Sequence, residues 1–221
     1  MAESTEDLVD PTMLFRFAQG CKRYPRQWTS KGVSLSERYQ VPGFGDLGGR
    51  VPFADFRIGY NASGLFVNIR VKGKQENLWC RENRIEDSDG VLLWIDTRNT
   101  QTIHRASRFC HQFMLMPQGG GSGFNLPLAK MIPIHRAREH PVEVRTEQLQ
   151  VQSTVQRSGY ELRGWIPADC LTGFDPEDYP RLGFSYAVID RELGWQTFSL
   201  GPEYPIREDP SLWGTLELEL S

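Results

Sequence analysis

The sequence lacks any long apolar segment and carries little net charge for its length. No apolar run in its 221 residues approaches the roughly 20 residues that a membrane-spanning helix needs. The net charge is −3, from 25 basic and 28 acidic residues, so no global positive field would gather nucleic acid. We therefore expect neither a membrane nor a nucleic acid as a partner.

The N-terminus also lacks the parts of a secretory signal. It reads MAESTEDLVDP, with no basic first segment and no apolar segment after it. Three acidic residues among its first seven predict a short flexible tail over residues 1–12. We expect a cytoplasmic protein with one domain over residues 13–221, a length that all-β domains commonly reach.

Cysteine is scarce, and no CxxC pair occurs, so the sequence does not indicate a zinc knuckle. The four cysteines lie far apart, at Cys21, Cys80, Cys110 and Cys170. In a reducing cytosol such scattered cysteines are expected to be free thiols.

Motifs for phosphate binding and for nucleophilic catalysis are missing as well. The glycine-rich stretch Gln118–Gly123 has no Lys-Ser/Thr and no helix after it, so we expect a mobile surface loop there. No GxSxG elbow is present. Asp96 and Asp190 each end an apolar strand and are the best candidates for the paired carboxylates of a glycosidase. Because Asp at a strand end also starts turns, we favour a structural role for both and expect no enzyme.

Short runs of Val, Ile, Leu and aromatic residues recur between turn signals, which is typical of an all-β sandwich or barrel. Val91–Ile95 is apolar on both faces, which predicts a central strand covered on both sides. No amphipathic helix is predicted, and Pro167–Leu171 fits one helical turn. The predicted strands are Leu14–Phe17, Phe56–Tyr60, Leu65–Val71, Val91–Ile95, Phe113–Met116, Leu149–Val155, Tyr160–Ile166, Leu182–Ile189, Trp195–Leu200 and Thr215–Leu220.

Two groups of residues contain possible metal ligands, and each also has a structural interpretation. His111 with Met114 or Met116 would suit haem or a metal, but on a strand His111 faces away from both methionines. Asp87 and Asp89 offer oxygen ligands for calcium in a tight turn, although the distal Glu of an EF-hand is missing. We favour a solvated turn there and expect no cofactor and no metal.

Six tryptophans carry the clearest indication of a binding surface. An exposed aromatic ring beside Arg and Asn is how proteins hold sugars, because the ring covers the CH face while the polar groups fix orientation. Those within or beside apolar runs, and therefore predicted to be core, are Trp94, Trp165 and Trp213. Those among polar or turn residues, for which exposure and packing both stay open, are Trp28, Trp79 and Trp195.

Five segments follow one another in an order and spacing that a known family shares. They are Gly64–Val71, Asp89–Arg98, Gly159–Pro167, Leu182–Asp190 and Pro210–Leu218. Together they resemble family 9 carbohydrate-binding modules and the related DOMON-like sandwich domains. The resemblance begins near Ala54 and implies a β-sandwich with jelly-roll-like connections.

The resemblance also implies a function, that of a non-catalytic binding module for a saccharide or another small polar ligand. On this hypothesis Trp79 stacks on the ligand. Arg81, Arg98 and Asn99 then supply hydrogen bonds to it.

Two departures from the family pattern keep alternatives open. Leu92 stands where the family has Glu, and Lys72-Gly73 stands where it often has a carboxylate. The main alternative is therefore a structural or protein-interaction domain that has lost the sugar site, with a protein as its partner. A haem or metal module is a third, weaker alternative.

Overall fold

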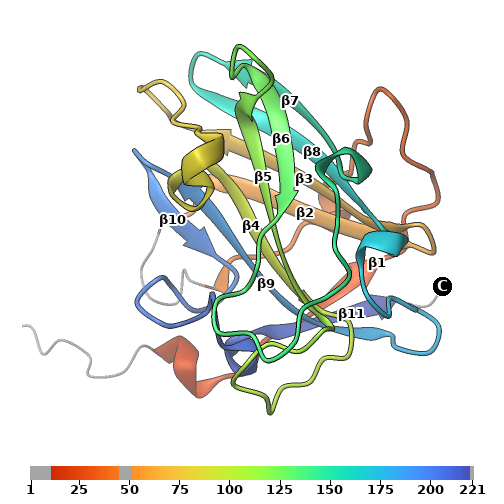
Figure 1. Cartoon of the computed structure of the whole chain (residues 1–221). Helices are drawn as coiled ribbons and strands as arrows, with labels where there is room; N and C mark the ends of the chain where they lie inside the picture. The colour runs from red at the N-terminus through yellow and green to blue at the C-terminus, as the bar shows by residue number, and fades with distance from the viewer. Residues whose placement is uncertain (1–10, 45–50, 220–221) are drawn as a thin grey trace, which may run out of the picture.

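The computed structural model describes residues 11–44 and 51–219, which form eleven strands in two sheets (Figure 1). One sheet has the strand order β1-β11-β9-β4-β5-β6, with β10 paired to the end of β9, and the other has the order β2-β3-β8-β7. The strands are β1 (Ala18–Lys22), β2 (Ala54–Asn61), β3 (Gly64–Lys72), β4 (Gly90–Asp96), β5 (Cys110–Gly120), β6 (Leu126–Met131), β7 (Gln150–Gln156), β8 (Gly159–Pro167), β9 (Arg181–Asp190), β10 (Gly194–Thr197) and β11 (Gly214–Glu219).

Helical structure in the described residues is confined to short 3-10 turns. They are η1 (Pro11–Leu14), η2 (Glu37–Tyr39), η4 (Glu82–Asp87), η5 (Thr146–Gln148), η6 (Ala168–Cys170) and η7 (Pro210–Leu212). Within the two described ranges, none has the length and apolar character that crossing a membrane requires. The prediction of an all-β sandwich is confirmed, and η6 confirms the single turn expected near Pro167.

The main core lies between the two sheets. Alternation along β3 places Leu65, Val67 and Ile69 on the inner face, where each is at most 1% exposed. Leu93 of β4 and Phe184 of β9 meet them from the opposite sheet. Burying these side chains removes apolar surface from water and provides the main stabilisation of the fold.

Strand β4 is buried on both faces, as its unbroken apolar sequence predicts. It lies between β9 and β5, and all seven of its residues are buried. Leu92 and Trp94 point away from the main core into a second cluster, where loop residues such as Trp213 cover them. The indole N–H of Trp94 donates to Gln112 Oε1 at 3.1 Å, which satisfies its one polar group.

A third apolar cluster covers part of the outer face of the four-stranded sheet. Residues 24–39 fold back over Phe66, which is fully buried. Trp28 stacks on Trp165, with ring centroids 6.5 Å apart and planes 15° apart. Trp28 therefore packs against the sheet, which removes it from the candidates for a ligand platform.

Several sequence predictions fail or fall outside the described residues. Leu14–Phe17 is not a strand, because Leu14 ends a 3-10 turn and the first strand begins at Ala18. Gln118–Gly123 is not a mobile loop; it ends β5 and begins the turn to β6. The predicted tail over residues 1–12 lies outside the described residues, apart from the last two positions.

The expected state of the cysteines is confirmed. Cys21, Cys80, Cys110 and Cys170 are all free and buried. Burial raises the pKa of the Cys80 and Cys110 thiols to about 12, so both stay protonated near neutral pH.

His111 on β5 is a structural residue of the main core, so the haem or metal hypothesis is wrong for it. The N–H of Thr172 donates to its Nε2 at 2.9 Å, and its Nδ1 lies 3.4 Å from the carbonyl oxygen of Ile95. Its ring lies parallel to that of Phe113, on the face opposite Met114 and Met116. Burial lowers its pKa to about 4.

The depressed pKa of His111 predicts a loss of stability in mild acid. Between pH 6.5 and about 4 the unfolded chain binds a proton on His111 that the folded chain does not, so the free energy of unfolding falls as pH falls. The loss reaches roughly 3 kcal/mol at the acid end of that window. Urea unfolding at several pH values should show it, and His111→Gln should lack this component. An equal dependence of the free energy of unfolding on pH in both proteins would contradict the assignment of this effect to His111.

Candidate functional site

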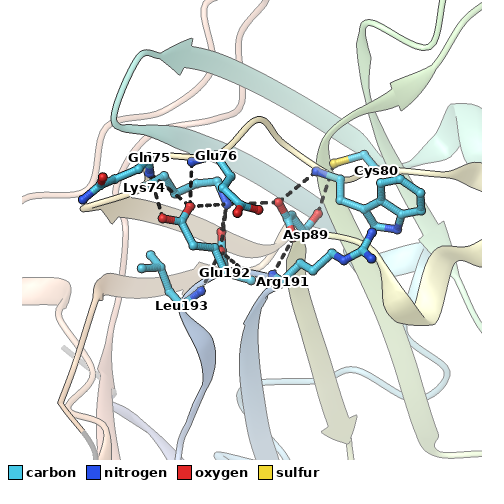
Figure 2. Close-up of polar contacts among 10 residues, drawn as sticks. Lys74, Gln75, Glu76, Cys80, Asp89, Arg191, Glu192 and Leu193 are labelled. Atoms are coloured by element: carbon cyan, nitrogen blue, oxygen red, sulfur yellow. Dashed lines mark hydrogen bonds and ion pairs between the residues drawn. The ribbon is translucent and has the colours of Figure 1, made fainter.

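A buried ion cluster lies at one end of the central strands, where Lys74, Asp89 and Asp190 meet (Figure 2). All three are at most 4% exposed. Lys74 Nζ lies 2.8 and 2.7 Å from the two carboxylate oxygens of Asp190 and 3.3 Å from Asp89 Oδ2. Glu192 is next to them, with its Oε2 3.7 Å from Lys74 Nζ.

Strand pairing explains why these residues meet. In the antiparallel pair of β4 and β9, Gly90 lies opposite Ile189. The residues just beyond, Asp89 and Asp190, therefore end up side by side although they are far apart in sequence. Gly90 has φ of +157°, and a Cβ there would lie 2.3 Å from the carbonyl oxygen of Leu115, so only glycine fits.

The carboxylate of Asp89 positions two backbone segments at once. It accepts a hydrogen bond from the Trp79 N–H at 3.0 Å and another from the Arg191 N–H at 2.8 Å. The segment before β4 is thereby fastened to the turn after β9. Lys74 supplies the charge that makes burial of this carboxylate tolerable.

Asp190 and Glu192 fix the turn between β9 and β10. Asp190 Oδ1 accepts the N–H groups of Glu192 and Leu193, each at 3.0 Å, which is the side-chain turn expected of Asp at a strand end. Gly194 closes the turn with φ of +91°. The Glu192 carboxylate in turn accepts the N–H of Glu76 at 2.9 Å, so the turn and the segment before β4 are joined a second time.

The charges of the cluster are strongly coupled. Burial alone would lower the pKa of Lys74, but hydrogen bonds and attraction from Asp190 and Asp89 outweigh burial and raise it. The hydrogen bond from the Glu76 N–H lowers the pKa of Glu192. Near neutral pH the ammonium of Lys74 and the carboxylate of Glu192 therefore stay charged.

Trp79 and Trp195 line one cleft beside this cluster. Its volume is about 440 Å³, which lies in the range of small-molecule sites. Trp79 comes from the segment that Asp89 fastens, and Trp195 lies on β10 opposite Ile189. Both rings are half-buried. Residues of η4 and the loop after β10 complete the lining.

Arginine side chains lie over both aromatic rings. The guanidinium carbons of Arg81 and Arg191 are 4.7 and 4.4 Å from the centre of the Trp79 ring. That of Arg207 is 5.0 Å from the Trp195 ring. Each contact is a cation–π interaction that leaves N–H groups available as donors.

Paired charges form the polar side of the same cleft. Arg207 Nη1 lies 3.4 Å from Glu86 Oε2, and its Nη2 donates to the Glu86 carbonyl oxygen at 3.1 Å. Arg84 Nη2 lies 3.3 Å from Asp87 Oδ2. The cleft thus offers flat apolar surfaces together with both donors and acceptors.

The predicted site residues divide into two groups. Trp79 lines the cleft and Arg81 adjoins it. Arg98 and Asn99 lie beyond the other end of β4, which puts them roughly 20 Å away at the usual rise per residue. The structure therefore does not bring Arg98 and Asn99 to the cleft.

Arg98 and Asn99 have local structural partners instead. The Arg98 guanidinium lies 3.6 Å from the centre of the Tyr179 ring and donates to the carbonyl oxygen of Gly173 at 2.6 Å. Asn99 Oδ1 accepts hydrogen bonds from Gln101 and Thr215, each at 3.3 Å. Both side chains hold loops together at that end of the sandwich.

The sequence offers calcium ligands at Asp87 and Asp89, but the two side chains lie in different environments. Asp87 is exposed and pairs with Arg84, as a solvated turn predicts. For Asp89 that interpretation is wrong, because its carboxylate is fully buried and bound to Lys74. Over the described ranges, no group of three or more His, Cys, Asp or Glu side chains is arranged to hold a metal ion.

The two strand-end carboxylates do not form a glycosidase pair. Asp96 lies opposite Gly183 and Asp190 lies beyond Ile189, so strands β4 and β9 separate them by roughly 20 Å instead of the 5–9 Å that hydrolysis needs. Asp96 accepts the N–H groups of Arg98 and Thr100, which confirms its role in a turn.

One exposed group contains the residue types of a hydrolase triad, but its geometry differs. Ser211 Oγ and Asp209 Oδ2 both approach the same nitrogen of His104, Nδ1, at 3.1 and 3.0 Å. A triad needs the serine and the carboxylate on opposite ring nitrogens. His104 therefore connects two loops and does not activate Ser211.

Solved structures with a similar fold include two saccharide complexes. A family 9 carbohydrate-binding module from Caldicellulosiruptor kristjanssonii in complex with cellotriose matches with a TM-score of 0.61 at 10% identity, over 92% of this chain and 94% of that one. Its glucose complex matches with a TM-score of 0.58 at 11% identity, over 92% and 96%. A protein from Bacteroides uniformis ATCC 8492 matches with a TM-score of 0.55 at 12% identity, over 93% and 100%.

The chain has the fold of family 9 carbohydrate-binding modules. The resemblance seen in the sequence is thereby confirmed at the level of the fold. No protein-family model and no curated protein matches the chain. At 10–12% identity the likeness describes the backbone, and the site has to be argued from this chain's own residues.

Removing the ammonium of Lys74 should strongly destabilise the fold. Lys74→Met leaves Asp89 and Asp190 buried beside each other without a counter-charge, which costs roughly 3–5 kcal/mol. Arg70→Met is the control, because the Arg70–Glu161 ion pair is on the surface and contributes about 1 kcal/mol or less. Chemical unfolding measures both variants, and equally small losses would contradict a central role for Lys74.

Proposed function

We propose that the chain is a non-catalytic saccharide-binding module and that the cleft between Trp79 and Trp195 is its binding site. The observation that carries this proposal is the placement of the two tryptophans. They come from segments more than a hundred residues apart, and both segments are fastened to the same buried ion cluster.

The chemistry of the cleft suits a sugar ring. A pyranose has apolar CH faces and a hydroxyl edge, so it needs an aromatic surface and polar groups beside it. The arginines donate to hydroxyl oxygens, while Glu86 and Asp87 accept from hydroxyl hydrogens. Structures of the same fold with cellotriose and with glucose support this ligand class.

The two tryptophans play different parts in this proposal. Two guanidinium groups lie over Trp79, whereas one lies over Trp195. Trp195 therefore offers the larger free surface for stacking. Trp79 mainly holds Arg81 and Arg191 in place as hydrogen-bond donors.

Rigid attachment of the cleft favours binding. Asp89 fixes the backbone at Trp79 and Arg191 before a ligand binds. Binding therefore orders few residues and costs little conformational entropy. We expect modest dissociation constants, micromolar to millimolar, which correspond to about −4 to −8 kcal/mol.

A protein-interaction role is the second candidate. Met13, Leu14 and Phe15 are exposed by 46%, 73% and 61%, an unusual run of apolar surface before β1.

Trp195→Ala should weaken saccharide binding at least tenfold, because it removes the main stacking surface. Isothermal titration with glucose, cello-oligosaccharides and other soluble mono- and oligosaccharides measures this, with circular dichroism to show that the variant folds. Trp79→Ala should weaken binding to a smaller extent. Trp28→Ala is the matched control, because Trp28 packs on Trp165 away from the cleft.

A wild-type protein that binds no saccharide in a broad panel would refute the proposal. Equal losses in Trp195→Ala and Trp28→Ala would refute the assignment of the site. In the first case the exposed segment around Leu14 becomes the better guide to function.

A further inference from the structure

A second hollow lies near the cleft, and neighbouring residues of the segment before β4 line both. Its volume is about 640 Å³, and its lining comes from Arg81, Glu82, Asn83, Phe124 and Lys130. The contact between Arg81 and Trp79 lies between the two, since Trp79 lines the cleft and the Arg81 guanidinium, 4.7 Å from the centre of the Trp79 ring, lines the hollow. A ligand that fills the first cleft would therefore reach the second hollow by passing over Arg81.

Phe124 is held out toward this hollow by an ordered turn. It lies between β5 and β6 and is 56% exposed. Its φ is +53°, in the left-handed region that bulky residues rarely adopt. Two backbone hydrogen bonds fix this conformation, from the Phe124 N–H to the Gly121 carbonyl oxygen at 3.2 Å and from the Gly119 N–H to the Phe124 carbonyl oxygen at 3.0 Å.

An exposed ring in a strained and hydrogen-bonded turn is better explained by binding than by packing. Backbone strain of this kind persists where the surrounding structure enforces it, and it is common at ligand sites. The ring is outside all three apolar clusters of the fold. Its position therefore presents an apolar surface to whatever enters the hollow.

Polar groups around Phe124 are available to a ligand. Within residues 11–44 and 51–219, neither Arg81 nor Lys130 has a carboxylate within ion-pair distance. Asn83 adds an amide with donors and an acceptor. An aromatic ring flanked by such groups repeats the arrangement of the first cleft.

We propose that the Phe124 hollow is a second subsite, so that the ligand is an oligosaccharide that runs from the Trp79–Trp195 cleft across Arg81 to Phe124. This inference rests on the proposed function and narrows its ligand class from sugars in general to chains of several units. One unit stacks at Trp195 and a later unit stacks at Phe124, while Arg81 between them donates to both.

The test compares ligands of different length. Isothermal titration of the full chain uses glucose, mannose and xylose and their β-1,4-linked oligomers of two to six units. We expect the affinity to rise at least tenfold from monomer to hexamer in the series that binds best. Phe124→Ala should abolish that gain and leave the affinity for the monomer within twofold, whereas Phe124→Tyr should keep the gain.

Val155→Ala is the matched control, because Val155 is another exposed apolar residue and lies on β7. Val155→Ala should change neither the affinity for the monomer nor the affinity for the hexamer. No gain with length in the wild type, or an equal loss for monomer and hexamer in Phe124→Ala, would overturn the second subsite and leave the first intact. Failure of every sugar to bind would overturn the proposed function and this inference together.

Discussion

The ammonium of Lys74, buried between the carboxylates of Asp89 and Asp190, is the interaction on which the site depends. Pairing of β4 with β9 forces the two acids together, and without a cation they would repel each other in a medium that screens poorly. With the ammonium between them, their carboxylate oxygens also accept backbone N–H groups. One cation therefore fixes two segments that no strand pairing connects, and the walls of the cleft follow from it.

The cleft lies outside the main core between the two sheets. The residues that line the cleft come from the segment before β4, the end of β9, the turn after it, β10 and the loop after β10, while the main apolar core lies between the sheets. Because the cleft and the main core use different residues, the residues of the cleft can differ widely from those of other structures with this fold.

The sequence predicts the sandwich well because strand alternation and turn residues are local signals. The central position of β4 follows directly from its two apolar faces. The strands β1 and β6 escape prediction because AQGCK and LPLAKM carry little alternation. The site is harder to predict. Arg98 is close to Trp79 in sequence, but the full length of strand β4 separates the two residues in space. Lys74 resembles any surface lysine in the sequence, because its partners Asp89 and Asp190 are identified only by the strand pairing.

The ion pair between Lys74 and Asp190 joins residues 116 positions apart, and this has a consequence for folding order. Contacts this distant form late, because a large loop has to close before they stabilise anything. The early hairpin of β2 and β3 needs only a two-residue turn, whereas the cleft requires that β9 has already paired with β4. The walls of the cleft are therefore completed late in folding, and binding of the proposed saccharide would report a chain in which β4 and β9 have already paired.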